Sequence, residues 1–231
     1  MPEHTLAGAR VLVLGGSGVL GSLIAGQLHQ HGAAVVLAGR NAQRLQETAT
    51  SIGPETPSAL IDLNQPHHAG HVVSTAIERM AGLDGVVNAA GVVGFGPFAE
   101  MSDEALDEIV AVDLVGPLRV IREALPHLDG GFVVNITGVV AEQPVAGMVA
   151  YSAVKAGLSA ATRALARELR RRRIDVIDAR PPHTETGLAG RPITGTAPSM
   201  PVGLDPTHVA SVIVEAIASG KREIPASDFG P

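Results

Sequence analysis

The segment RVLVLGGSGVLG, residues 10–21, joins a short apolar run to a glycine-rich turn and decides the fold. Arg10–Leu14 is typical of a buried strand, and a helical pattern begins at Val19. Glycines at positions 15, 18 and 21 allow a tight turn, close approach of the backbone to a pyrophosphate, and close packing of helix on strand. The start of the helix offers free N–H groups to an anion. This segment therefore predicts a phosphate-binding loop with contacts from Gly15, Ser17, Gly18, Leu20 and Gly21.

The alternation of strand and helix continues along the whole chain. Apolar runs without polar alternation indicate strands that are buried on both faces, which favours a parallel sheet. The expected strands are Arg10–Leu14, Ala34–Ala38, Ser58–Leu63, Gly85–Asn88, Phe132–Ile136 and Ile174–Ala179. The expected helices are Val19–His31, Asn41–Ile52, Pro66–Ala81, Ser102–Leu125, Val149–Arg173 and Pro206–Ser219. This order predicts an α/β fold, a doubly wound and mostly parallel sheet with helices on both faces.

Composition narrows the class of protein. The 231 residues are 45% hydrophobic and 17% charged, which is ample material for one core, and we expect a single domain over residues 1–231. The net charge of −6 argues against nucleic acid as a partner. The absence of cysteine excludes disulfides and zinc sites built on thiolates. No apolar run reaches the roughly 18 residues of a membrane span, and the first residues do not resemble a signal peptide, so we expect a cytoplasmic protein without membrane contact.

The second expected strand ends in Gly39-Arg40-Asn41, at the position that distinguishes NAD from NADP in doubly wound folds. A carboxylate here would bond both ribose hydroxyls and repel a 2′-phosphate, whereas a guanidinium matches phosphate. We therefore expect Arg40 and Asn41 to contact the cofactor, with NADP(H) favoured over NAD(H). The alternative is that Arg40 only ends a strand at the surface.

The only tyrosine, Tyr151, stands one helical turn before Lys155, one of only two lysines. Residues at this spacing share a helix face, and an adjacent ammonium favours the phenolate form of a tyrosine. Elsewhere, His67, His68 and His71 have helical metal-ligand spacing but no evident third ligand, so we predict no metal site. Residues 183–204, rich in proline and without periodicity, predict a lid over the site.

Several motifs in this order resemble the short-chain dehydrogenase/reductase family, whose single-domain members have a Rossmann-type fold. They are the glycine loop at 15–21, Asp62-Leu63, Asn88-Ala89-Ala90-Gly91, Tyr151-Ser152-Ala153-Val154-Lys155 and the segment from Pro181 to Thr186. The resemblance implies that Tyr151 exchanges a proton with a substrate oxygen while hydride passes to or from a nicotinamide. It implies that Lys155 supports the phenolate and bonds the ribose. Further cofactor contacts are implied for Asp62, Leu63, Asn88, Ala89, Ala90, Gly91, Pro181 and Thr186.

Two departures from that family bear on catalysis. Gly138 falls where the family has a serine that holds the substrate oxygen. Thr137 is our candidate replacement, provided that the chain turns at Gly138; otherwise the hydroxyl is missing. Asp113 falls where the family has an asparagine, and as a carboxylate it would oppose phenolate formation. We count Asp113 with Tyr151, Lys155 and Thr137 among the catalytic candidates, and we expect a higher pH optimum.

The sequence thus predicts an NADP(H)-dependent oxidoreductase acting on a carbonyl or secondary alcohol. The expected lining of the cleft, which includes Val92, Val93, Phe95, Met148 and Leu188, favours an apolar small molecule as substrate. Two alternatives stay open: a non-redox or cofactor-sensing protein that binds the dinucleotide without hydride transfer, and a lyase or epimerase. The family resemblance implies a homodimer or homotetramer.

Overall fold

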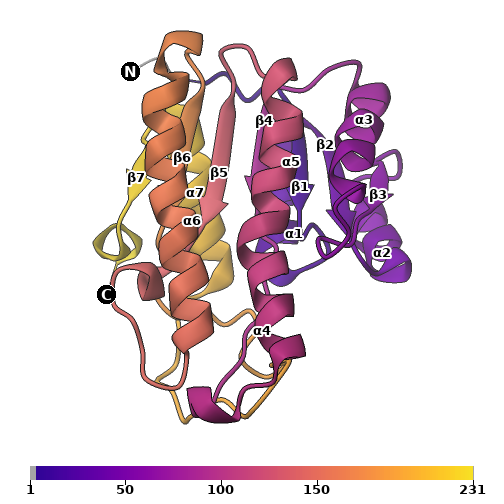
Figure 1. Ribbon diagram of the computed structural model, residues 1–231. Helices are drawn as coiled ribbons and strands as arrows, with labels where there is room; N and C mark the ends of the chain where they lie inside the picture. The colour runs from indigo at the N-terminus through magenta and orange to yellow at the C-terminus, as the bar shows by residue number, and fades with distance from the viewer. Residues whose placement is uncertain (1–3, 231) are drawn as a thin grey trace.

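The computed structural model describes residues 4–230, in which one seven-stranded, wholly parallel sheet has the order β3-β2-β1-β4-β5-β6-β7 (Figure 1). The strands are β1 Arg10–Leu14, β2 Ala34–Gly39, β3 Ser58–Leu60, β4 Gly85–Asn88, β5 Phe132–Ile136, β6 Asp175–Ala179 and β7 Glu223–Ile224. The helices are α1 Val19–Gln30, α2 Ala42–Ile52, α3 His68–Met80, α4 Asp103–Val110, α5 Gly116–Ala124, α6 Val149–Glu168 and α7 Pro206–Ser219.

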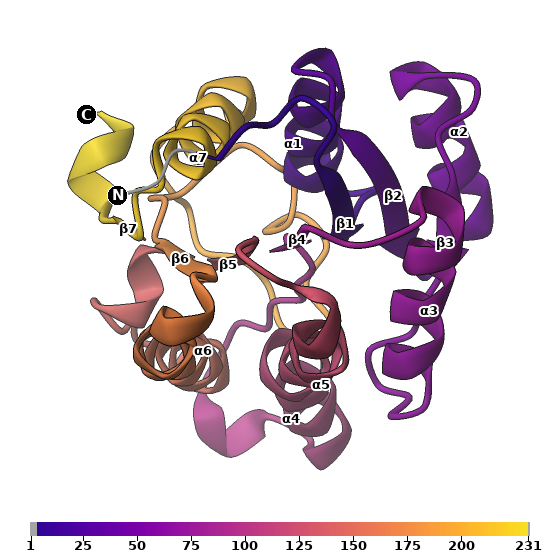
Figure 2. The same cartoon turned by 90° about the horizontal axis from the view of Figure 1, so that it is seen from above.

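Helices cover both faces of the sheet, as the apolar strands require. In the view from above, α1 and α7 lie on one side of the strands, and α5 and α6 lie on the other (Figure 2). Two buried apolar clusters result, one beneath α1, α2 and α7 and one beneath α3, α5 and α6. Val11, Leu12, Val13 and Leu14 of β1 are all fully buried, and they contribute alternately to the two clusters. The predicted doubly wound fold is confirmed.

Two expected elements end at least three residues earlier in the structure than predicted. The strand expected over 58–63 ends at Leu60, because Asp62 Oδ1 accepts hydrogen bonds from the main chain and side chain of Asn64 and turns the chain. Residues 169–172 form a 3₁₀ turn after α6 rather than continuing the helix. The short edge strand β7 has no counterpart among the predicted strands.

The helix expected over 102–125 is interrupted by a π-helical turn at Ala111–Val115. Pro117 has no N–H to donate to the carbonyl oxygen of Asp113 four residues earlier, so the ordinary helical ladder cannot continue through this point. A Cβ on Gly116 would lie 2.7 Å from the Cβ of Leu63, which shows how closely the helix approaches the loop after β3. The turn widens the helix where Asp113 is carried, and π-turns of this kind are frequent at functional sites.

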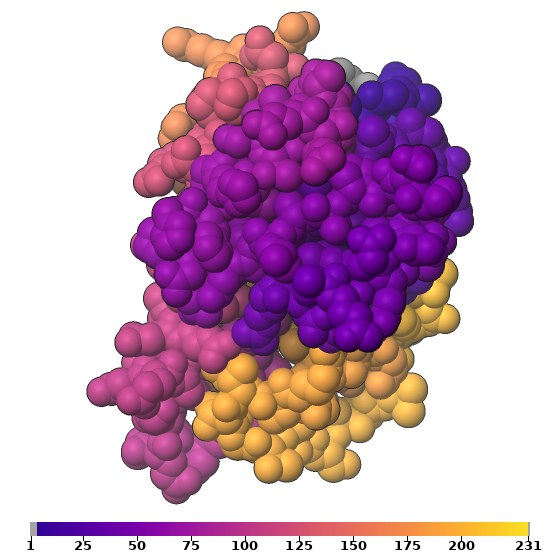
Figure 3. All heavy atoms as spheres, turned by 90° about the vertical axis from the view of Figure 1, so that its right-hand side faces the viewer, coloured from indigo at the N-terminus to yellow at the C-terminus, as the bar shows by residue number. Residues whose placement is uncertain are grey.

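The lid expected at residues 183–204 is held by contacts at its two ends and in its middle. Thr184 bridges Leu204 in parallel fashion, which holds the two ends of the lid together. In the middle, Ile193 N donates to Val93 O at 2.8 Å, and Phe95 N donates to Thr194 O at 3.0 Å. In the space-filling view the lid, in orange, lies below the violet half of the chain (Figure 3). It therefore forms a defined wall of the site.

Candidate active site

A cleft of about 810 Å³ lies at the carboxyl ends of the strands, where doubly wound folds bind their ligands. The phosphate loop, the loops after β2, β3, β4 and β5, the first turns of α6 and the lid all line it. Of the predicted site residues, those in the cleft wall are Gly15, Ser17, Gly18, Leu20, Arg40, Asn41, Asp62, Leu63, Ala89, Ala90, Gly91, Thr137, Tyr151, Lys155, Pro181 and Thr186. Gly21, Asn88 and Asp113 are buried and do not line the cleft.

The phosphate loop has the geometry that an anion requires. Gly15 adopts φ +71°, which favours glycine, and a Cβ on Gly21 would overlap Gly15 O. Helix α1 begins after Gly18 with no side-chain cap and no acidic residue in its first turn. Its first N–H groups and the positive end of its dipole therefore face the cleft unopposed by a carboxylate of that turn. This cradle fits the pyrophosphate of a dinucleotide.

Two guanidinium groups stand beside the end of β2. Arg40 is largely exposed, and its Nη1 lies 3.2 Å from Glu108 Oε1 of α4. Arg44, which the sequence analysis did not single out, also lines the cleft and donates from Nη2 to Ser17 O at 3.0 Å. Arg44 follows Arg40 by one helical turn, and this spacing could have predicted that both arginines face the same site. Asn41 caps α2 by accepting from Arg44 N, so its side chain has a structural partner as well as a place in the cleft.

The loops after β3 and β4 close the back of the cleft. Asp62 N donates to His68 Nδ1 at 3.1 Å, so this histidine holds the Asp62 loop. Asn88 is buried and donates from Nδ2 to Asn135 Oδ1 at 3.2 Å. Within residues 4–230, no three or more His, Asp or Glu side chains gather in a way that could hold a metal ion. His67, His68 and His71 therefore do not form such a group.

Tyr151 and Lys155 come together in the first turns of α6, as their spacing predicts. The Lys155 ammonium lies 5.5 Å from the centre of the Tyr151 ring and donates to Ile136 O of β5 at 3.2 Å. Lys155 is 4% exposed, so its charge acts in a medium of low dielectric constant. Burial raises the pKa of Tyr151, and the ammonium of Lys155 opposes that rise. The pair is thus placed to move a proton at the phenolic oxygen.

Asp113 stands behind Lys155, on the π-helical turn. Its Oδ1 lies 3.4 Å from Lys155 Nζ, and both carboxylate oxygens accept from Val92 N at 3.3 Å. The side chain is fully buried, and this burial raises its pKa from 3.8 to about 6 although Lys155 opposes the rise. Burial lowers the pKa of Lys155, but the charges of Tyr151 and Asp113 outweigh it and raise that pKa overall. Above about pH 6 the buried group beside Lys155 is therefore a carboxylate.

Because the pKa of Asp113 is raised in the folded protein, the free energy of unfolding depends on pH. The variant Asp113→Asn should lack this contribution to the pH dependence. Between pH 3.8 and about 6 the folded protein holds a proton on Asp113 that the unfolded chain releases, so wild type loses stability as pH rises. The free energy of unfolding of the variant, relative to wild type, should increase across this range by up to about 3 kcal/mol. Urea unfolding at several pH values measures it. Asp107→Asn, an exposed change on α4, is the control, and an equally flat difference for both variants would contradict the prediction.

Thr137 is the one catalytic candidate whose geometry does not support its expected role. The chain turns at Gly138, with φ +80°, but the Thr137 hydroxyl donates to Asp178 Oδ1 at 2.6 Å. Asp178 is buried on β6, and it also accepts from Ser159 and Arg180. Because the hydroxyl donates its one hydrogen bond to this carboxylate, Thr137 has no O–H directed at a substrate oxygen. The sequence could not show this, since Asp178 is distant along the chain and adjacent only in the sheet.

The fold and the site together define a dinucleotide-binding α/β protein with a half-buried tyrosine beside a buried lysine at the carboxyl edge of its sheet. Within residues 4–230, no helix is long and apolar enough to cross a membrane.

Comparison with known proteins places this class within a family. Residues 9–194 match the short chain dehydrogenase family. An uncharacterized oxidoreductase of Staphylococcus epidermidis is 30% identical over 210 residues, with 89% of each chain covered. A crystal structure of a dehydrogenase/reductase from Sinorhizobium meliloti is 29% identical, has a TM-score of 0.85 and covers 98% of each chain. A short chain dehydrogenase from Burkholderia cenocepacia in complex with NADP is 27% identical, with a TM-score of 0.85 over 97% of this chain and 98% of that one. The chain belongs to the short-chain dehydrogenase/reductase family and is an enzyme of that class.

Proposed function

We propose that this enzyme transfers hydride between NADP(H) and a carbonyl or secondary alcohol on an apolar small molecule. The observation that carries the proposal is the pair of half-buried Tyr151 and buried Lys155, which lines the same cleft as the phosphate loop. When bound, the nicotinamide supplies or accepts the hydride. Tyr151 donates its phenolic proton to the oxygen of a ketone, or accepts the proton of an alcohol. Lys155 stabilises the phenolate, and hydrophobic residues such as Val93, Phe95 and Leu188 exclude water.

The cofactor preference rests on the end of β2. No carboxylate stands at residues 39–41, and both Arg40 and Arg44 line the cleft there. The ion pair of Arg40 with Glu108 involves an exposed guanidinium, so it is weak enough for a phosphate to replace it. Two structures similar to this chain contain NADP or NADPH, which supports the same preference.

Arg40→Ala tests the preference for NADP(H). Loss of a guanidinium–phosphate contact should weaken NADPH binding by roughly tenfold or more and leave NADH binding nearly unchanged. Fluorescence titration of both nucleotides measures the two dissociation constants. Arg79→Ala, an exposed arginine at the end of α3, matches the change in charge outside the cleft. Equal weakening of NADPH and NADH would contradict the assignment of Arg40 to the 2′-phosphate.

We propose that the charge of Asp113 shifts the pH profile of alcohol oxidation to higher pH. The carboxylate opposes formation of the phenolate, because its charge raises the pKa of Tyr151. Removing it in Asp113→Asn should therefore move the rate profile of alcohol oxidation to lower pH.

A second candidate is a cofactor-sensing protein that binds the dinucleotide without hydride transfer. It is favoured by two observations at the end of β5: Gly138 has no hydroxyl, and the Thr137 hydroxyl donates its hydrogen bond to Asp178. Mixing the enzyme with NADPH and a panel of apolar ketones separates the two functions. Oxidation of NADPH supports the reductase, and tight binding without oxidation across the panel supports the sensor. The lyase or epimerase alternative has no separate support in the site.

The assembly and the cellular location stay predictions. We propose a homodimer or homotetramer in the cytoplasm, with no nucleic-acid or membrane partner, and sedimentation velocity of the purified protein tests the assembly.

A further inference from the structure

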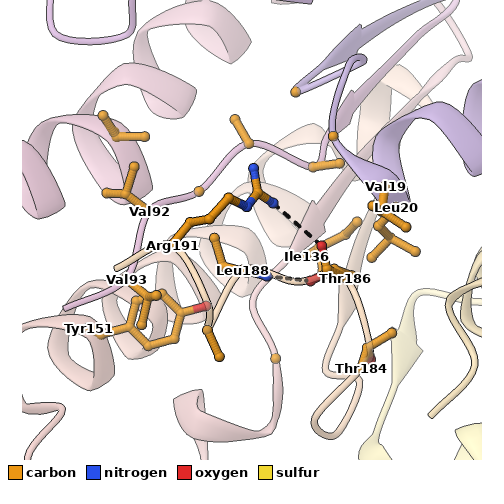
Figure 4. Close-up of a pocket in the computed structure, with 18 of the residues that line it drawn as sticks. Val19, Leu20, Val92, Val93, Ile136, Tyr151, Thr184, Thr186, Leu188 and Arg191 are labelled. Atoms are coloured by element: carbon orange, nitrogen blue, oxygen red, sulfur yellow. Dashed lines mark hydrogen bonds between the residues drawn. The ribbon is translucent and has the colours of Figure 1, made fainter. Parts of the chain in front are cut away.

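The lid extends one charged side chain into the cleft. Arg191 lines the cleft, and Figure 4 shows its guanidinium lying across the space between Tyr151 and the first residues of α1, Val19 and Leu20. The side chain is held by its own turn, since Nε donates to Gly187 O at 3.1 Å and Nη2 donates to Thr186 O at 3.4 Å. Within residues 4–230, Nη1 has no hydrogen-bond partner. These two hydrogen bonds partly fix the guanidinium of Arg191, and its Nη1 can still donate to a ligand.

The charges around Arg191 leave its guanidinium unneutralised. Asp62 is the one acidic residue among the described residues of the cleft wall, and no ion pair joins it to Arg191. The other cations of the wall have different surroundings: Arg40 pairs with Glu108, Arg44 contacts Ser17 O, and Lys155 pairs with buried Asp113. Arg191 is therefore the cation of the wall that faces the middle of the cleft from the lid.

We propose that Arg191 binds the pyrophosphate of the dinucleotide from the lid side, opposite the amino end of α1. This inference rests on the proposed function, because it needs a dinucleotide in the cleft. The pyrophosphate belongs at the start of α1, where Gly18 begins a helix with no acidic residue in its first turn. A guanidinium forms paired hydrogen bonds with phosphate oxygens, and partial fixation by Gly187 O lowers the entropy cost of forming them.

Such a contact links cofactor binding to the substrate pocket. The residues just after Arg191 are bonded to the loop after β4, through Ile193 N with Val93 O and Phe95 N with Thr194 O. Leu188, three residues before Arg191, and Val93 line the same cleft as Tyr151 (Figure 4). A pyrophosphate held by Arg191 would therefore stabilise the wall that faces the substrate. We expect bound NADPH to slow amide hydrogen exchange in residues 187–194.

Two nucleotides and three variants test the proposal by binding alone. Adenosine 2′-monophosphate has the 2′-phosphate of NADPH but no pyrophosphate. In calorimetric titrations, Arg191→Gln should weaken NADPH binding by about tenfold and leave the affinity for adenosine 2′-monophosphate unchanged. Arg40→Ala should weaken binding of both nucleotides. Arg79→Gln, which makes the same change in charge at the end of α3, should alter neither.

Arg191→Lys and hydrogen exchange distinguish an anion contact from a merely structural role. The lysine keeps the charge without the fork, so its NADPH affinity should fall between those of wild type and Arg191→Gln. NADPH should protect residues 187–194 from exchange less in Arg191→Gln than in wild type.

Three results would overturn the inference while leaving the proposed function intact. The first is an NADPH affinity within about twofold of wild type in Arg191→Gln, with Arg40→Ala still weakened. The second is equal weakening of adenosine 2′-monophosphate and NADPH in Arg191→Gln, which would mean general damage to the cleft. The third is a loss confined to the KM of an anionic ketone, which would assign Arg191 to the substrate. If wild type binds neither nucleotide, the proposed function itself fails.

Discussion

Tyr151→Phe should reduce turnover by roughly 100- to 10,000-fold, the range typical of losing a positioned acid–base group. The phenolic oxygen of Tyr151 is the group that we propose to exchange a proton with substrate, and Tyr151 is the only tyrosine in the chain. The ring itself stays in the variant, so the packing of α6 against the cleft should be preserved. Steady-state oxidation of NADPH with a ketone that wild type reduces gives the measurement.

The affinity for NADPH is the control for this variant. It should change little, because the phosphate loop and the arginines beside β2 are untouched. Turnover of Tyr151→Phe within about threefold of wild type would remove Tyr151 from the mechanism. Loss of turnover together with loss of NADPH binding would instead assign Tyr151 to the cofactor site.

Gly21→Ala should weaken NADPH binding by roughly 10- to 100-fold and lower the free energy of unfolding by about 1–3 kcal/mol. A methyl group at this position overlaps the carbonyl oxygen of Gly15, so the phosphate loop or the start of α1 must move. That movement displaces the N–H groups that face the pyrophosphate. Calorimetric titration with NADPH and urea unfolding measure the two effects.

Gly26→Ala is the matched control, because it makes the same change on the same helix. A Cβ on Gly26 would meet only Ile52 Cγ1, at 4.0 Å, so no strain is expected. Alanine favours the helix over glycine, and this variant should gain about 0.5–1 kcal/mol in free energy of unfolding with unchanged NADPH affinity. Similar behaviour of the two variants would contradict the account of the phosphate loop.

The fold was predictable because its causes are local. Apolar runs such as Val11–Leu14 and Gly85–Asn88 have no polar alternation, and a strand of that kind needs a helix on each face. The features that differ depend on contacts between distant residues or on single missing donors. Pro117, which removes one N–H from the ladder, turns an expected continuous helix into α4, a π-helical turn and α5. Strand β7 has only two residues, too few for a periodic pattern.

The site was predictable where chain spacing alone brings residues together. Tyr151 and Lys155 are neighbours on one helix, and the glycine loop is continuous in sequence. The direction of the Thr137 hydroxyl depends on Asp178 of the next strand, and the environment of Asp113 depends on Val92 and Lys155. Arg191 lies in the cleft wall because the lid that carries it is hydrogen-bonded to the loop after β4. Contacts between residues that lie far apart in the sequence leave no short-range pattern, so the sequence alone could not predict them.

The transfer of deuterium from NADPH labelled at the nicotinamide C4 tests the central claim most directly. Wild type, incubated with the labelled cofactor and an apolar ketone, should give an alcohol that carries deuterium on its carbinol carbon. The same incubation with Tyr151→Phe should give almost none, although the cofactor stays bound. Tight binding of NADPH by wild type without any deuterated alcohol, across a broad panel of ketones, would contradict hydride transfer and identify a protein that only binds the dinucleotide.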